Sequence, residues 1–147
     1  MDISNSLTYH ITKTGNVLRQ LSAKRIKDAG LNLTPEESVL MNQLWDRDNQ
    51  TITELNLWSV KEASTLTRQI VSLVKKAYVE RHHGTADRRT VFVRLTSEGK
   101  KLQSKFNKTM IPNLDRDVAD IPQKDADKLL KLLIKVRDSA LVELQGQ

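Results

Sequence analysis

Two neighbouring arginines occupy a short loop between two segments of alternating residues. The loop contains Asp87, Arg88 and Arg89, and one aspartate cannot pair with both guanidinium groups. The flanking segments, 78–82 and 90–95, alternate with a period of two, which predicts an antiparallel hairpin. An arginine at the tip of this hairpin is therefore left to bind an anion outside the chain.

A helix predicted at residues 61–76 presents a second set of groups suited to phosphate binding. At 100° per residue, one side of this helix is apolar, with Ala63, Leu66, Ile70, Leu73, Val74 and Ala77. The opposite side carries cations and small hydroxyls, namely Lys61, Ser64, Thr65, Arg68, Ser72 and Lys75, with Thr67 on its flank. A solvent-facing helix in a chain with 18 acidic residues would usually mix both signs of charge. This acid-free face therefore indicates contact with a polyanion.

The net charge of +6 is concentrated around these two features. Residues 61–94 hold eight basic and three acidic side chains, and the rest of the chain shares a surplus of only one positive charge. A basic segment within a nearly neutral chain favours DNA or RNA as a partner. A solvated helix face beside a charged loop is the alternative interpretation.

Capping signals and apolar periodicity predict the helices that must position these groups. Residues 3–29 carry one apolar stripe, and Gly30 stands where a helix is expected to stop. The sequence Thr-Pro-Glu-Glu at 34–37 forms a capping box that starts a second helix, ending near Asp46. A short strand is predicted at 51–52, followed by a brief helix that Thr53 caps and that runs through Ser59. After the hairpin, Thr96 caps a helix that ends near Ile111, where Pro112 follows. Pro122 opens a final helix, which carries a second long apolar stripe.

A short helix, a turn, a second helix and a basic hairpin follow one another in the order of a winged helix-turn-helix. In this arrangement the second helix enters the major groove of DNA. The hairpin tip reaches the neighbouring minor groove, whose negative potential attracts an arginine. Asp87 can then hold one arginine in position, while the other arginine, or the same one extended past Asp87, enters the groove.

The sequence resembles the MarR family of bacterial transcriptional regulators over nearly its whole length, most densely from Thr34 to Gly99. The matching segments are LTPEESVLMNQLW, ITEL, STLTRQIVSLVKKAYVER and DRRTVFVRLTSEG. The resemblance implies a mainly α fold with a small β-hairpin wing. It places an N-terminal dimerisation helix at 1–32, the winged helix-turn-helix domain at 33–96 and C-terminal dimerisation helices at 97–147.

The resemblance also implies roles for individual residues. Ser64, Thr65, Thr67 and Arg68 match the part of the recognition helix that contacts phosphates and base edges in the family. Asp87 and Arg89 match the acid and the minor-groove arginine of the wing, with Arg88 beside them.

A homodimer of this kind is expected to bind a palindromic, inverted-repeat operator in double-stranded DNA. Repression would follow from exclusion of the polymerase, although activation is equally compatible with the residues. Members of the family are commonly released from DNA by small, often phenolic, ligands bound between the dimer layer and the winged domain. Tyr9, His10 and Trp45 are the candidates for a pocket that accepts a small aromatic effector, although Trp45 and Trp58 also fit the pattern of core residues.

Three departures from the family pattern leave the geometry of the helix-turn-helix open. Ser59, Val60 and Lys61 stand where the family usually has an apolar residue, a glycine and another apolar residue. Ala77 replaces the usual glycine before the first wing strand, and Asn56 stands where alanine is common. The angle between the two helices and the identity of the base-reading residue depend on these positions.

Several classes of function are disfavoured by what the sequence lacks. Without cysteine, disulfides, thiolate metal sites and thiol oxidation are excluded. His82 and His83 alternate on a strand and, with His10, do not complete a metal site. No enzyme motif or cofactor motif is present, and no signal peptide or membrane span is seen, so a cytoplasmic, non-catalytic protein is expected. An RNA-binding winged helix and a protein-interaction module remain as alternatives.

Overall fold

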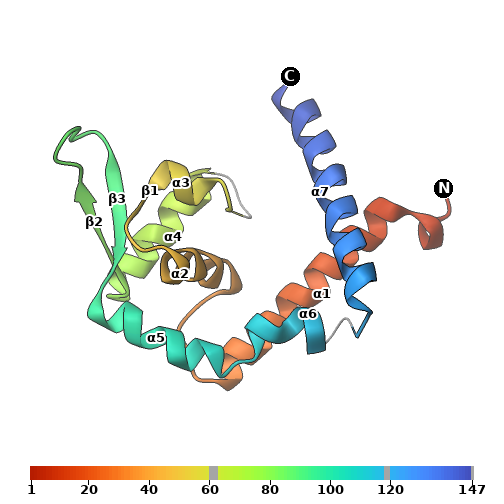
Figure 1. Cartoon of the computed structure of the whole chain (residues 1–147), viewed down its shortest axis with the longest axis horizontal. Coiled ribbons are helices and arrows are strands. Elements are labelled where there is room, and N and C mark those ends of the chain that lie inside the picture. Colours follow the sequence, from red (N-terminus) through yellow and green to blue (C-terminus); the bar gives the residue numbers. More distant parts are fainter. Residues whose placement is uncertain (60–62, 118–119, 147) are drawn as a thin grey trace. The chain divides into compact units, whose positions relative to one another are not determined.

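The computed structural model describes residues 1–59, 63–117 and 120–146 (Figure 1). Lys61, one of the predicted site residues, lies outside this part of the chain, as do Val60 and Glu62. The chain divides into two compact units, Met1–Ile111 and Pro112–Gln147. No described helix is both long enough and apolar enough to cross a membrane.

Unit 1 contains the sheet and most of the helices. Its elements are the 3-10 helix η1 (Ile3–Asn5), α1 (Leu7–Asp28), α2 (Pro35–Asp46), β1 (Gln50–Thr51), α3 (Ile52–Asn56), α4 (Ala63–Lys75), β2 (Val79–His83), β3 (Val91–Leu95) and α5 (Ser97–Asn107). The 3-10 helix η2 (Ile111–Asn113) follows, and unit 2 contains α6 (Leu114–Asp117) and α7 (Gln123–Gln145).

The first two helices begin and end at capping residues. The predicted single helix at 3–29 is instead interrupted, because Ser6 is extended and its hydroxyl accepts the Tyr9 backbone N–H, so α1 starts at Leu7. Gly30 follows α1 with φ of 71°, as expected for a left-handed stop. The capping box at the start of α2 is confirmed, and α2 ends at Asp46.

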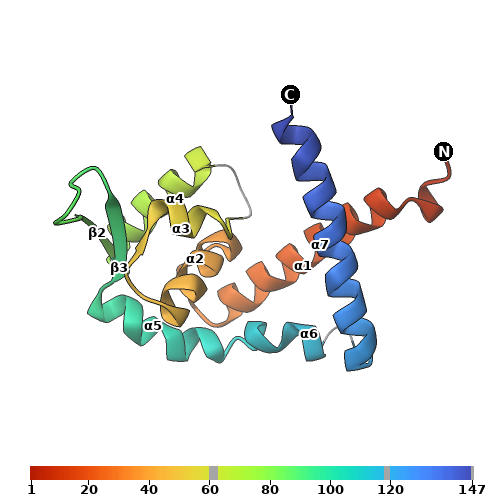
Figure 2. The same ribbon diagram turned by 45° about the horizontal axis from the view of Figure 1, so that its top comes forward.

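A three-stranded antiparallel sheet, in the order β1-β3-β2, forms the wing and its base. The predicted hairpin is confirmed, with Val79 opposite Leu95 and His83 opposite Val91. The short strand β1 adds to β3 through the pairing of Thr51 with Phe92. In Figures 1 and 2 the loop between β2 and β3 projects beyond the helices of unit 1.

Thr51, and not Thr53, caps α3, so the predicted helix from Thr53 to Ser59 is wrong at both ends. The Thr51 hydroxyl accepts the Glu54 backbone N–H at 3.1 Å. Since Thr51 is also the last residue of β1, the chain passes directly from the sheet into the helix. The helix then ends at Asn56.

The hydrophobic core of unit 1 lies between α2, α4, α5 and the sheet. It includes Leu40, Met41, Leu44, Leu55, Leu66, Ile70, Leu73, Val79, Val93, Leu102 and Phe106. Ala77, predicted on the apolar side of the long helix, is instead exposed. The helix has already ended at Lys75, and Ala77 turns the chain toward β2 with φ of 64°.

The C-terminal helices begin as predicted, but α5 is shorter than predicted. Thr96 caps α5 by accepting the Gly99 N–H at 3.0 Å. The helix ends at Asn107, before Ile111, because Met110 adopts a left-handed backbone with φ of 62°. Pro122 precedes α7, which extends over Gln123–Gln145 and has no buried residue.

Candidate nucleic-acid interface

The outer face of α4 consists of exposed hydroxyls and cations. Leu66, Ile70 and Leu73 anchor the helix in the core, as the periodicity predicted. On the other side lie Ser64, Thr67, Arg68 and Lys75, all exposed, with Thr65 half-buried beside them. Arg68 donates from Nη2 to the Thr65 hydroxyl at 3.2 Å, which gives its guanidinium a defined place on this face. The described part of α4 carries no acid, so the face can accept a phosphate backbone without repulsion.

Ser72 differs from its neighbours on this predicted face. Its side chain is half-buried and lies beside the carboxylate of Glu37 on α2. Burial raises the pKa of Glu37, but hydrogen bonds from Lys76, the Thr34 backbone N–H and Ser72 together hold that pKa below its ordinary value. The structure therefore gives Ser72 a contact inside the domain, and its predicted contact with DNA stays a prediction.

At the tip of the wing, Asp87 forms hydrogen bonds with Arg89. Asp87 Oδ1 accepts the backbone N–H of Arg89 at 3.0 Å and its Nε at 3.2 Å. These two bonds lower the pKa of Asp87. The Arg89 side chain is nevertheless 93% exposed, so its guanidinium remains accessible from solvent. Arg88 is exposed too, and its carbonyl accepts from Nδ1 of His83 at 2.7 Å.

Glycine and aromatic stacking shape the rest of the wing. The Gly84 N–H donates to the Thr90 carbonyl at 2.9 Å, and a Cβ at Gly84 would lie 2.8 Å from the backbone oxygen of Asp87. Only glycine fits this close approach without a shift of the backbone. His82 stacks on Phe92 with ring centroids 5.3 Å apart and contacts Asn49 Oδ1 through Nε2 at 2.7 Å. The histidines of this hairpin thus make contacts that support the wing.

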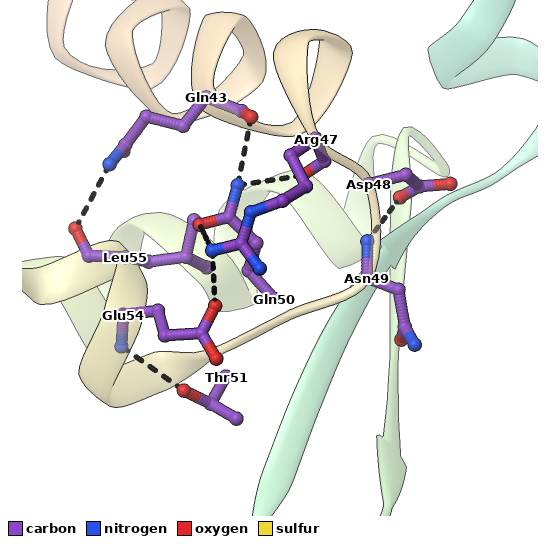
Figure 3. A network of polar contacts seen from close by, with 8 residues as sticks. All are labelled: Gln43, Arg47, Asp48, Asn49, Gln50, Thr51, Glu54 and Leu55. Atoms are coloured by element: carbon purple, nitrogen blue, oxygen red, sulfur yellow. Dashed lines mark hydrogen bonds and ion pairs between the residues drawn. The ribbon is translucent and has the colours of Figure 1, made fainter.

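A polar network that the sequence did not reveal connects the end of α2 with α3 (Figure 3). The Gln50 amide donates to the carbonyls of Gln43, at 2.9 Å, and Arg47, at 2.6 Å. Arg47 in turn donates to Glu54 of α3 at 2.5 Å, and the Gln43 amide donates to the Leu55 carbonyl at 3.3 Å. These bonds fix the short helix α3, which precedes α4 in the chain. The sequence indicated only a polar turn, because a buried glutamine resembles an exposed one.

The turn at Asp48 and Asn49 also forms hydrogen bonds with the sheet. Asp48 Oδ1 accepts the backbone N–H of Asn49 and that of Leu95 at the end of β3, each at 2.8 Å. Asn49 is left-handed, with φ of 58°, and its side chain contacts His82. Helix α2 and the wing are therefore tied together by two consecutive polar residues.

The three residues predicted for a ligand pocket fall into two different places. Tyr9 and His10 lie near the start of α1 with their rings edge to face, and His10 Nε2 contacts the Ser4 carbonyl at 2.8 Å. Trp45 instead packs on Phe106 and donates from Nε1 to the Gly99 carbonyl at 2.9 Å. Trp58 is 69% exposed and lines a shallow hollow with Asn42 and Arg47.

A family model supplies the identification that the geometry suggests. The model of the transcriptional regulators SarA/Rot matches residues 22–106, which include α2, α4, the wing and all of α5 except its last residue. The chain belongs to the SarA/Rot family of transcriptional regulators. Members of this family are regulators and not enzymes. No curated protein matches the chain.

Solved structures place this SarA/Rot-family regulator in the MarR type of winged-helix fold. A variant of MarR from E. coli, complexed with operator DNA, has a TM-score of 0.77 at 23% identity, covering 88% of this chain and 92% of its own. AbfR of Staphylococcus epidermidis has a TM-score of 0.73 at 21% identity, covering 95% and 93%. BpsR of Bordetella bronchiseptica has a TM-score of 0.79 at 19% identity, covering 92% and 95%. The resemblance seen in the sequence is thus confirmed for the fold, and the protein is a transcriptional regulator with a winged-helix fold.

Proposed function

We propose that this regulator binds an inverted-repeat operator as a homodimer and represses transcription from it. The observation that carries the proposal is the pair of cationic surfaces in unit 1. One is the acid-free outer face of α4 with Arg68 and Lys75, and the other is the exposed guanidinium of Arg89 at the wing. A helix enters the major groove, and an exposed arginine on a hairpin suits the adjacent minor groove.

The terminal helices support the homodimer. Helix α7 is 23 residues long and leaves a set of large apolar side chains exposed, namely Leu129, Leu130, Leu132, Leu133, Ile134, Val136, Leu141, Val142 and Leu144. On α1, Leu7, Val17 and Leu18 are exposed as well. Apolar surface of this extent favours burial against another protein surface, and a second copy of the chain offers an identical one.

Two-fold symmetry and charge determine the expected mode of binding. The half-sites of the operator should lie about 10 base pairs apart, centre to centre, so that both recognition helices enter the major groove on one face of the duplex. Because Lys and Arg displace counterions from phosphates, the affinity should fall steeply as salt is raised. A dimer bound over a promoter represses by excluding the polymerase.

A small aromatic effector completes the proposal. CouR from Rhodococcus jostii was solved with p-coumaroyl-CoA, and DNA binding by BpsR is regulated by 6-hydroxynicotinic acid. An effector of this class would release the regulator if it bound the DNA-incompetent conformation more tightly. Tyr9 and His10, which lie together near the start of α1, stay proposed for this pocket, and Trp45 stays proposed only as a separate contact because it packs on Phe106.

The test is binding of the purified protein to the DNA upstream of its own gene, over a salt series and with random duplex as competitor. Tight, competitor-resistant binding that Arg68→Ala and Arg89→Ala both weaken would support the proposal. Sedimentation of Leu133→Asp, with Lys131→Asp as the matched surface control, tests the dimer, and only the first variant should dissociate. Binding no tighter than to random duplex would contradict operator recognition on this DNA, and a structured RNA competitor would then test the RNA-binding alternative.

A further inference from the structure

Two consecutive lysines at the end of the recognition helix have opposite environments. Lys75, the last residue of α4, is exposed on the outer face. Lys76 turns inward, where its Nζ lies 2.7 Å from Oε1 of Glu37, and only 19% of its side chain is exposed. The Glu37 side chain is 3% exposed, so this is a buried ion pair between α2 and the end of α4.

The same oxygen of Glu37 also holds the start of α2. Oε1 accepts the backbone N–H of Thr34 at 2.9 Å, while the Thr34 hydroxyl accepts the Glu37 N–H at 3.0 Å. A capping box alone needs no charge, because glutamine serves equally well at this position. The negative charge of the carboxylate instead matches its second partner, the ammonium group of Lys76, which the capping box does not explain.

Lys76 lies at the junction from which the wing departs. The Ala77 N–H donates to the Val74 carbonyl at 3.0 Å, and the Tyr78 N–H donates to the Leu73 carbonyl at 3.1 Å, which closes the end of α4. Thr96, the cap of α5, then donates its hydroxyl to the Ala77 carbonyl at 2.5 Å. Its backbone N–H donates to the Tyr78 carbonyl at 3.1 Å. These bonds connect α4, β2 and α5 at Ala77 and Tyr78, the two residues that directly follow Lys76.

We propose that Glu37 and Lys76 are positioning residues for DNA reading, which set the recognition helix and the wing at one fixed angle to α2. Lys76 is then not a phosphate contact despite its charge, whereas Lys75 is one. A buried ion pair is costly to desolvate and often adds little stability, but any arrangement that separates its two charges leaves each of them unpaired in the interior. This inference rests on the proposed operator binding, because a fixed angle between α2 and the recognition helix would help the protein discriminate the operator from other DNA sequences.

The experiment compares Lys75→Met with Lys76→Met in operator and random-duplex binding across a salt series. Lys75→Met should weaken both affinities together and reduce the salt slope by about 0.9, the effect of one lost phosphate contact. Lys76→Met should leave the salt slope unchanged but reduce the ratio of operator to random-duplex affinity about tenfold. Glu37→Gln, which keeps the capping bond, should reduce the ratio to the same extent.

The double variant Glu37→Gln/Lys76→Met separates positioning from stability. Without an unpaired buried charge, it should regain the melting temperature that each single variant loses, yet keep the low affinity ratio. Recovery of both quantities would show that the pair serves stability alone and would overturn the inference. A reduced salt slope for Lys76→Met would also overturn it, because Lys76 would then contact phosphate.

Hydrogen exchange of the free protein keeps this inference distinct from the proposed function. Exchange at the β2 amides, Val79–His83, should accelerate in Lys76→Met and in Glu37→Gln but not in Lys75→Met. Failure of the wild type to discriminate operator from random duplex would contradict the proposed function. Unchanged β2 exchange in Lys76→Met and Glu37→Gln would contradict the positioning role, whatever the DNA result.

Discussion

Arg89 is held by Asp87 through two hydrogen bonds to a single carboxylate oxygen, from its backbone N–H at 3.0 Å and from Nε at 3.2 Å. Its Nη2 lies 3.5 Å from the other oxygen, at the limit of a hydrogen bond. Asp87 therefore orients the arginine from one edge and leaves most of the guanidinium donors for an external acceptor. The side chain has already lost part of its rotamer freedom before DNA arrives, which favours binding.

We expect Arg89→Ala to weaken operator binding about tenfold, which corresponds to about 1.4 kcal/mol. Arg88→Ala should have a smaller effect, because among the described residues none orients the Arg88 side chain in the way that Asp87 orients Arg89. Fluorescence anisotropy with a labelled operator measures both affinities. A larger loss for Arg88→Ala than for Arg89→Ala would reverse the assignment of the minor-groove arginine.

Replacing Gly84 should alter the wing without unfolding the domain. In Gly84→Ala the new methyl group would lie 2.8 Å from the Asp87 backbone oxygen, so the turn that presents Arg89 must open. Operator affinity should fall about tenfold, or 1.4 kcal/mol, while the melting temperature stays close to that of the wild type. Thr85→Ala, at an exposed neighbouring position, is the matched control and should retain full affinity.

Ala77→Gly should stabilise the protein by about 1 kcal/mol, since a left-handed backbone costs about that much for a residue with a Cβ. Ala77 has φ of 64° and is exposed, so no packing is lost when its methyl group is removed. The urea midpoint of unfolding reports the change. Ala29→Gly is the control, because Ala29 ends α1 in a right-handed conformation with φ of −81°. A gain of stability in that variant would contradict the backbone explanation.

The buried carboxylate of Glu37 predicts a loss of stability in acid. The pKa of Glu37 in the folded protein lies below its ordinary value of 4.5, so the folded state binds this proton less readily than the unfolded chain. Its stabilising contribution is therefore complete above the ordinary value and is lost as the pH falls through the folded pKa. Urea unfolding near neutral pH and at about pH 3.5 should show the difference between wild type and Glu37→Gln shrinking in acid. A difference that does not change with pH would refute this ionisation.

Local signals were enough to predict much of the fold. The capping box at Thr34 and the cap at Thr96 depend on residues three positions away, and both are confirmed. The division of α4 into buried and exposed faces follows from helical periodicity alone, which Leu66 and Arg68 illustrate. These features form from neighbours in the sequence, so they could be predicted without tertiary information.

Other features depended on partners distant in the sequence. Thr51 and Thr53 are equally good caps by type, and the pairing of Thr51 with Phe92 decides between them. Helical periodicity places Lys75 on the basic face and leaves Lys76 beside it, but it does not name a partner for Lys76. That partner, Glu37, lies 39 positions earlier in the chain, which is why the ion pair could not be predicted.

The central place of β3 limits how DNA release can work. This strand carries the wing on one edge, through β2, and on the other edge pairs with β1, which leads straight into α3 of the helix-turn-helix. Because β3 connects these parts, we expect a displacement at the wing tip to be transmitted to the helices of the same domain, so that the wing and α4 move together. In the proposed dimer, an effector would then act on the separation of two such rigid domains, so that both half-sites are lost in a single step.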